Sequence, residues 1–148
     1  MKTLLIIAFA SIFSSYCFSQ NVSTIVKILD LSVYPAIELD TVSGTPLDTG
    51  KISFNMDFKV SNVSDAASVR ILVGTNQNSG DILNQTSNIV FQSGQYYISQ
   101  NGAITPVNGY SANIRLNLTK QQEAAFNYIE LFIVDNQGNE TNRLYFNR

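Results

Sequence analysis

Acid–base chemistry in this chain falls to carboxylates, because the sequence contains no histidine. Without imidazole there is no histidine-based zinc site, no serine triad and no cysteine–histidine pair. The single cysteine, Cys17, lies in an N-terminal stretch that we expect to be removed, so we expect no thiolate chemistry in the mature chain. Three possibilities remain: a carboxylate enzyme, a metal site built from oxygen atoms, or no chemistry.

The tripeptide Asp48-Thr49-Gly50 resembles the catalytic triplet of aspartic proteases. Those enzymes need two such triplets, because two aspartates share one proton. This chain has one copy and would have to dimerise to form the pair. Lys51 follows directly, and a cation there favours ionising both carboxylates. Pro46, Asp48 and Gly50 are turn-forming residues ahead of an expected strand, and we favour this explanation.

Calcium is the metal that loop carboxylates would suit, because it takes six to eight oxygen ligands. The candidates are acidic or amide side chains in or near expected loops: Glu38, Asp40, Asp65, Asp135, Asn139 and Glu140. An EF-hand loop needs glycine at its sixth position, whereas Gly138 is fourth when Asp135 is first. We therefore expect a hairpin turn after Asp135 and predict neither a metal nor a cofactor.

Exposed aromatic rings would let a sugar or a peptide bind. The chain has no tryptophan, but Tyr96 and Tyr97 are adjacent on an expected strand and must point to opposite faces of it. Tyr110 follows shortly afterwards. We take Tyr96, Tyr97 and Tyr110 as candidate surface contacts. The simpler alternative is that tyrosine packs well on strands and needs no ligand to explain it.

Short strands must position these candidates. Every second residue in 51–60 is apolar: Ile52, Phe54, Met56, Phe58 and Val60. Strict alternation predicts a strand with one buried and one wet face, which is typical of antiparallel sheets. Similar stretches predict strands at 69–75, 88–92, 95–100, 110–118, 128–135 and 143–146, with one or two more upstream that break at Pro35.

Turn and cap signals separate these strands. Asn101-Gly102 predicts a tight hairpin turn, and Pro106 restricts the returning strand to an edge or a short length. Thr119 with Gln122 three residues later predicts the start of one helical turn. Seven to nine short strands in one domain predict an all-β, antiparallel β-sandwich, with a closed barrel as the alternative.

The stretch YIELFIVDNQGNETNRLYF, residues 128–146, resembles the final hairpin of fibronectin type III and bacterial immunoglobulin-like domains. Asp135, Gly138 and Asn139 occupy the turn between its strands. The resemblance implies an immunoglobulin/fibronectin III-like sandwich over residues 50–148, in which Tyr128 is the tyrosine that ties a loop back to its strand. It also implies adhesion, spacing or partner binding, and no catalysis.

The N-terminus has the pattern of a signal peptide. Lys2 provides a positive start, and the apolar run Leu4–Phe13 is too short for a membrane span of roughly 20 residues. We expect cleavage after Ser19, at a Ser-Gln junction that resembles exported proteins of Bacteroidetes-type bacteria. A lipoprotein signal requires a small residue before its cysteine, and Tyr16 stands there, so we expect Cys17 to be removed with the signal.

The expected mature chain, residues 20–148, is a single domain without cysteine, so its own core must hold it together. It keeps 8 basic and 11 acidic residues without a basic run, which argues against nucleic acid and anionic membranes. No second apolar span would insert into a membrane. We expect a secreted, periplasmic or cell-surface module, non-enzymatic, that is structural or binds an extracellular protein or glycan. The alternatives are a carbohydrate-binding accessory module and a dimeric aspartic protease.

Overall fold

A computed structural model describes residues 22–148. The expected signal peptide, with Cys17, and the expected new terminus at Gln20 lie outside the described residues. The elements are β1 (Ile28–Ala36), β2 (Lys51–Val60), a 3-10 turn η1 (Val63–Asp65), β3 (Ala66–Gly74), β4 (Leu83–Gln92), β5 (Gln95–Gln100), β6 (Ala103–Pro106), β7 (Ser111–Thr119), α1 (Lys120–Ala125), β8 (Tyr128–Asp135) and β9 (Leu144–Asn147).

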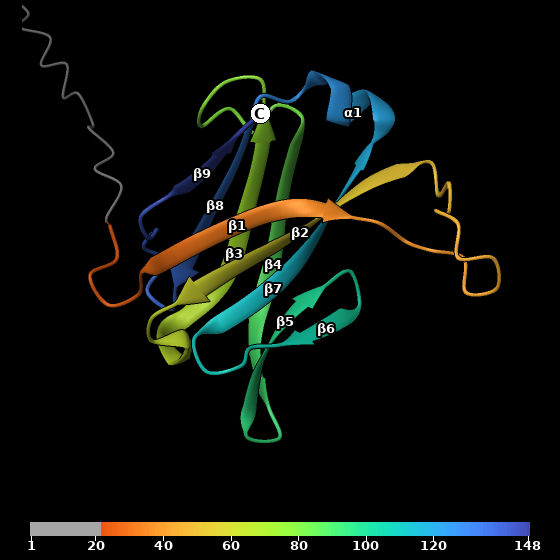
Figure 1. Cartoon of the computed structure of the whole chain (residues 1–148). Coiled ribbons are helices and arrows are strands. Elements are labelled where there is room, and N and C mark those ends of the chain that lie inside the picture. Colours follow the sequence, from red (N-terminus) through yellow and green to blue (C-terminus); the bar gives the residue numbers. More distant parts are fainter. Residues whose placement is uncertain (1–21) are drawn as a thin grey trace, which may run out of the picture.

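Two antiparallel sheets face each other, which confirms the predicted all-β sandwich. The smaller sheet has the order β1-β2-β7, and the larger has the order β6-β5-β4-β3-β8-β9. In Figure 1 the strands of the smaller sheet lie in front and cross those of the larger sheet at a steep angle. The alternative of a closed barrel is therefore wrong, because the strands of residues 22–148 divide into two separate sheets.

The core lies between the sheets and follows from the period-two pattern of the strands. In β2 the alternate residues Phe54, Met56, Phe58 and Val60 are buried. Neighbouring strands add their own inward side chains, including Ile114 and Leu116 of β7 and Ile129, Leu131 and Ile133 of β8. Each fully buried aliphatic or aromatic side chain contributes roughly 1.5–3 kcal/mol, so this layer supplies the main stabilisation of the domain.

The predicted turn chemistry is present. Asn101 and Gly102 both have positive φ, 49° and 84°, as a type I′ hairpin turn between β5 and β6 requires. At the start of α1 the Thr119 hydroxyl accepts a hydrogen bond from the Gln122 N–H at 3.1 Å, and the Gln122 side chain accepts from the Thr119 N–H at 2.9 Å. These reciprocal bonds fix the chain between β7 and β8.

Three local expectations differ from the structure. Pro35 does not break the first strand, because β1 is an edge strand and one side of its backbone needs no partner. β4 begins at Leu83, five residues earlier than expected, because it pairs with β3 along a polar stretch. Tyr128 opens β8, but its hydroxyl makes no hydrogen bond to any of residues 22–148, so it does not tie back a loop.

No helix among residues 22–148 has the length and apolar character that crossing a membrane would need. The α-helix found in the described part of the chain, α1, has six residues.

Candidate functional site

The three candidate tyrosines do not share one surface. Tyr96 points toward the inner side of the larger sheet, where its ring lies 4.8 Å from that of Phe91. Tyr97 points to the opposite side of β5, and both rings are half-buried. Tyr110 is 66% exposed in the turn before β7. A flat aromatic platform made by Tyr96 and Tyr97 together is therefore absent.

Asp48 lies in an exposed loop at the start of β2. Its carboxylate accepts a hydrogen bond from the Gly50 N–H at 3.0 Å and pairs with Lys120 Nζ at 3.3 Å. The Gly50 hydrogen bond, with a smaller contribution from Lys120, lowers the Asp48 pKa below its ordinary value. An aspartate that shares a proton with a second one needs the opposite environment.

The calcium candidates have other partners. The carboxylate of Asp135 accepts bonds from the N–H groups of Gln137 and Asn139, at 2.9 and 2.8 Å, inside the predicted hairpin turn. Burial acts to raise its pKa, but hydrogen bonds from Asn139, Ser23 and Gln137 outweigh it and lower the pKa. Glu140 turns away and pairs with Arg143 at 2.7 Å.

Of the remaining acidic candidates, Glu38 and Asp40 belong to another loop, whereas Asp65 adjoins that turn, because its carbonyl accepts a bond from the Asn136 N–H at 2.8 Å. Glu38 pairs with Arg115 at 2.9 Å, Asp40 accepts bonds from the backbone of Val42 and Ser43, and Asp65 ends the η1 turn. Residues 22–148 contain no group of three or more acidic, histidine or cysteine side chains placed to hold a metal ion.

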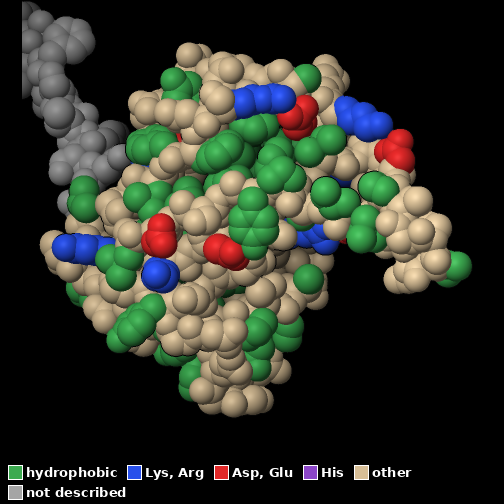
Figure 2. All heavy atoms as spheres, viewed as in Figure 1, with side chains coloured by type: hydrophobic (Ala, Val, Ile, Leu, Met, Phe, Trp, Pro, Cys, Tyr) green, Lys and Arg blue, Asp and Glu red, His purple; other side chains and the backbone are tan. Residues whose placement is uncertain are grey.

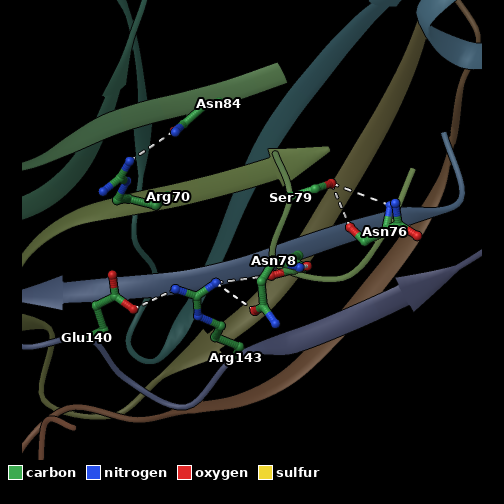
Figure 3. A network of polar contacts seen from close by, with 8 residues as sticks. Arg70, Asn76, Asn78, Ser79, Asn84, Glu140 and Arg143 are labelled. Atoms are coloured by element: carbon green, nitrogen blue, oxygen red, sulfur yellow. Dashed lines mark hydrogen bonds and ion pairs between the residues drawn. The ribbon is translucent and has the colours of Figure 1, made fainter. Parts of the chain in front are cut away.

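A buried ionic network lies on the outer face of the larger sheet (Figure 3). Glu130 of β8 is 1% exposed although it points away from the core. The loop between β3 and β4 covers it, and its carboxylate accepts a bond from the Asn78 N–H. Arg143, which precedes β9, donates to Glu130 at 3.2 Å and to the Asn78 side chain at 3.0 Å.

This network is internally satisfied. Arg143 also pairs with Glu140 and stacks 4.2 Å from the centre of the Phe132 ring. Burial acts to lower the Arg143 pKa, but Glu140 and Glu130 outweigh it and raise the pKa. Its donors are directed at protein acceptors, so the network holds the loop after β3 against the sheet and offers little to a ligand.

A projecting hairpin extends β1 and β2 beyond the body of the domain, and we call residues 37–50 the apolar arm (Figure 1). Its two sides are held by backbone hydrogen bonds of 2.8 Å between Asp40 and Thr45 and between Leu47 and Glu38. Asp40 closes the tip by accepting bonds from the Val42 and Ser43 N–H groups. The arm is therefore an ordered hairpin built by its own sequence.

Large apolar side chains cover this arm without packing into the core. Ile37, Leu39, Val42 and Leu47 are 70%, 53%, 95% and 48% exposed. Figure 2 shows hydrophobic side chains along the arm out to its tip. Ordered apolar side chains that project into solvent are typical of surfaces that bind another molecule.

The polar side chains of the smaller sheet form a second surface. Because directly paired residues share a face, the outer face of β1, β2 and β7 carries polar side chains almost throughout. A groove of about 340 Å³, which we call the polar groove, lies where this face meets β6. Its lining is Asp30, Ser32, Asp57, Phe58, Lys59, Thr105, Pro106, Asn108, Ser111, Ala112 and Asn113.

Sequence reasoning missed both surfaces. It assigned the polar positions of β2 to a wet face but did not combine them with those of β1 and β7, although the alternation predicts one common face. The arm carries a weaker signal: Ile37, Leu39 and Leu47 stand in a stretch rich in turn formers, where apolar residues have no predicted core to enter.

We compared the chain with protein families, curated proteins and solved structures, and no family model, curated protein or solved structure matches it.

Proposed function

We propose that this chain is an exported, non-enzymatic β-sandwich module that binds a partner protein through the apolar arm. The observation that carries the proposal is the exposure of four large apolar side chains on a hydrogen-bonded hairpin outside the core. Exposing apolar side chains to water is unfavourable, so their presence on this hydrogen-bonded hairpin supports a partner that covers them.

The strand order supports a fibronectin III or immunoglobulin-like ancestry. β3, β8 and β9 lie together in one sheet, and β1, β2 and β7 form the other. In immunoglobulin-like sandwiches the third strand and the last two likewise share a sheet, which extra strands can extend at one side. Here β4, β5 and β6 provide that extension. Modules of this kind serve adhesion and assembly, which agrees with a binding role.

The charges of the arm indicate what kind of partner it fits. Glu38 pairs with Arg115 and Asp48 with Lys120, while Asp40 is directed into its own turn. Since these carboxylates already have partners within the chain, the arm carries little unpaired charge beside its exposed apolar side chains. We therefore expect a partner with an apolar recess, and an association that changes little with salt concentration.

The test is recovery of the partner from the extracellular fraction of the source cells. The full chain carrying a crosslinker is compared with a variant in which Leu39→Ser, Val42→Ser and Leu47→Ser remove the apolar side chains of the arm. We expect the original chain to capture a defined protein and the arm variant to lose it, with the same far-UV circular dichroism and unfolding midpoint.

A matched control replaces exposed apolar residues elsewhere on the domain: Leu29→Ser, Ile104→Ser and Tyr145→Ser, which are 60%, 56% and 42% exposed in the original chain. This variant keeps the partner if the arm is the binding element. If the arm variant and the control variant both recover the partner protein, the proposal is contradicted. If both variants lose the partner protein, exposed apolar residues in general bind it, and the arm has no special role.

A further inference from the structure

The polar groove has the side chains of a ligand site, and its chemistry differs from that of the apolar arm. At its centre Asp57 of β2 accepts a hydrogen bond from the Tyr34 hydroxyl at 2.7 Å and another from the Asn113 side-chain amide. Tyr34 comes from β1 and Asn113 from β7, so all three strands of the smaller sheet fix one carboxylate.

The carboxylate of Asp57 is held only by neutral donors within residues 22–148. No Lys or Arg nitrogen of residues 22–148 lies within 4.0 Å of its carboxylate, whereas the neighbouring Asp30 pairs with Lys59 at 3.8 Å. A carboxylate has about four acceptor positions, and two are used here. The hydrogen bond to Asp57 raises the Tyr34 pKa above its ordinary value. The groove therefore keeps an anchored, partly unused hydrogen-bond acceptor.

The walls add both donors and acceptors. Ser32, Ser111 and Thr105 contribute hydroxyls, and Asn108 and Asn113 contribute amides. The backbones of Asn108 and Ser111 bond to each other at 2.9 and 3.0 Å, which fixes the turn that closes one side. The groove thus offers several hydrogen-bonding groups in a small volume, beside the apolar lining residues Phe58, Pro106 and Ala112.

An apolar ring lies beside these polar groups. Tyr34 does not line the groove itself, but it is 42% exposed on the same face and its hydroxyl bonds to the groove residue Asp57. Figure 2 shows charged side chains of both signs beside an apolar one on this front face of the domain. Tyr110, which precedes the lining residue Ser111, is 66% exposed, and its backbone carbonyl accepts a bond from the Val60 N–H at 2.8 Å.

We propose that the polar groove binds a neutral carbohydrate. Asp57 and Asn113 accept from and donate to neighbouring hydroxyls of one sugar, and the Tyr34 ring packs against its apolar face. A sugar combines closely spaced hydroxyls with C–H faces, and an amphipathic aromatic ring beside fixed acceptors matches both features. A sulfated or acidic glycan would place its charge against Asp57, which costs binding energy.

Metal binding fits the groove less well. Asp30 is committed to Lys59, and the described residues provide no three-acid cluster for a cation that prefers six to eight oxygens. The proposal also does not depend on the arm, which lies in a different part of the chain. Loss of partner capture by the arm variant and loss of sugar binding are therefore independent results.

Isotope-labelled protein titrated with a panel of neutral hexasaccharides at millimolar concentration tests the proposal by NMR. The panel contains α-glucan, β-glucan, mannan, galactan, xylan and chitin oligomers. We expect at least one of them to shift the backbone amides of Asp57, Ser111 and Asn113 and the side-chain amide of Asn113. Asp57→Asn should weaken that binding about tenfold or more, because it replaces a charged acceptor.

Two further variants keep the result independent of folding. Ser111→Trp keeps Asp57 in the sequence, places a large ring among the lining residues and should abolish the shifts. Ser53→Ala lies on the same face outside the groove and should leave them unchanged. The spectrum of each variant reports its fold directly. If no member of the panel shifts the groove amides, or if calcium chloride shifts them and the sugars do not, the proposal is overturned.

Discussion

Glu130 is nearly fully buried, yet it points away from the core. It is stable there because Arg143 and the Asn78 N–H provide its hydrogen bonds and the loop after β3 excludes water. A buried ion pair gains little over a well-packed apolar pair, but breaking it leaves an uncompensated charge. This pair therefore holds the loop after β3 and the strand β8 in their observed conformation.

Removing Arg143 tests whether breaking this buried ion pair destabilises the fold. We expect Arg143→Ala to lower the free energy of unfolding by about 3–5 kcal/mol, since Glu130 then stays buried without a cation. Arg70→Ala is the matched control, because Arg70 lies 5.7 Å from the same Phe132 ring and has no carboxylate partner within residues 22–148. Urea unfolding measures both. If Arg143→Ala lowers the free energy of unfolding no more than Arg70→Ala does, the ion pair does not stabilise the local conformation.

Asp81 lies in the same loop between β3 and β4, and it should make the stability of the folded chain depend on pH. Hydrogen bonds from the Ser79 hydroxyl and then from Thr75 lower its pKa from 3.8 to about 2. A lowered pKa in the folded state means that the stabilisation is complete above about 3.8 and is lost as the pH falls toward about 2. We expect the unfolding midpoint to fall across this window, and to fall less in Asp81→Asn, in which this group no longer titrates.

At the residue scale the sequence predicted the turn residues, but it did not predict which side chains distant in the sequence contact each other. Asn101-Gly102 and the Thr119–Gln122 pair act locally, so their chemistry is visible within a few residues. Glu130 and Arg143, or Asp57 and Tyr34, meet only after the strands have paired. Their contacts depend on register across the sheets, which no local pattern in a single sequence specifies.

Among the elements, α1 begins at a capped residue and depends on that cap. A helix of six residues is too short to be stable alone, so the bonds between Thr119 and Gln122 must select its start. We expect Thr119→Ala to lower the free energy of unfolding by about 1 kcal/mol and Thr119→Ser to change it little. Chemical denaturation of both variants measures the difference, and equal losses would show that the cap hydroxyl is unimportant.

The strands themselves were predictable where one face is buried and the other is wet. Residues 51–60 and 128–135 appear in the structure with the expected bounds, as β2 and β8. β4 was expected to be shorter because its first half, Leu83–Ser87, has few apolar residues, and Ser87 takes a buried position. The arm was not predicted, because its order comes from backbone pairing and the Asp40 turn.

At the scale of the whole molecule, the fold class followed from strand number, strand length and turn spacing. The pairing of β3 with β8 and of β2 with β7 did not follow, because these partners are far apart in the sequence. The two candidate surfaces depend on that pairing. The arm continues the two strands at one side of the smaller sheet, and the groove forms only where β7 approaches β6.

A side-chain amide joins the two sheets at one edge, in addition to the bond from the Gln100 side chain to the Arg115 carbonyl, and it makes their connection testable. Asn142, just before β9, accepts a bond from the Ile28 N–H at 3.0 Å and donates to the Ile28 carbonyl at 2.9 Å. Ile28 begins β1 in the smaller sheet, whereas β9 is an edge of the larger one. One amide thus satisfies both backbone groups of Ile28 and fixes the edge of one sheet to the edge of the other.

We expect Asn142→Ala to free the start of β1 while the rest of the sandwich stays folded. Amide hydrogen exchange should accelerate in residues 22–31, and the free energy of unfolding should fall by about 1–3 kcal/mol, the cost of leaving buried backbone groups unpaired. Asn142→Asp keeps the acceptor for the Ile28 N–H but loses the donor for its carbonyl, so its exchange rates should lie between those of the original chain and Asn142→Ala. If exchange in β1 is unchanged in Asn142→Ala, the core contacts of Ile28 and Val26 alone hold the two edges together, and the amide has no role in joining the sheets.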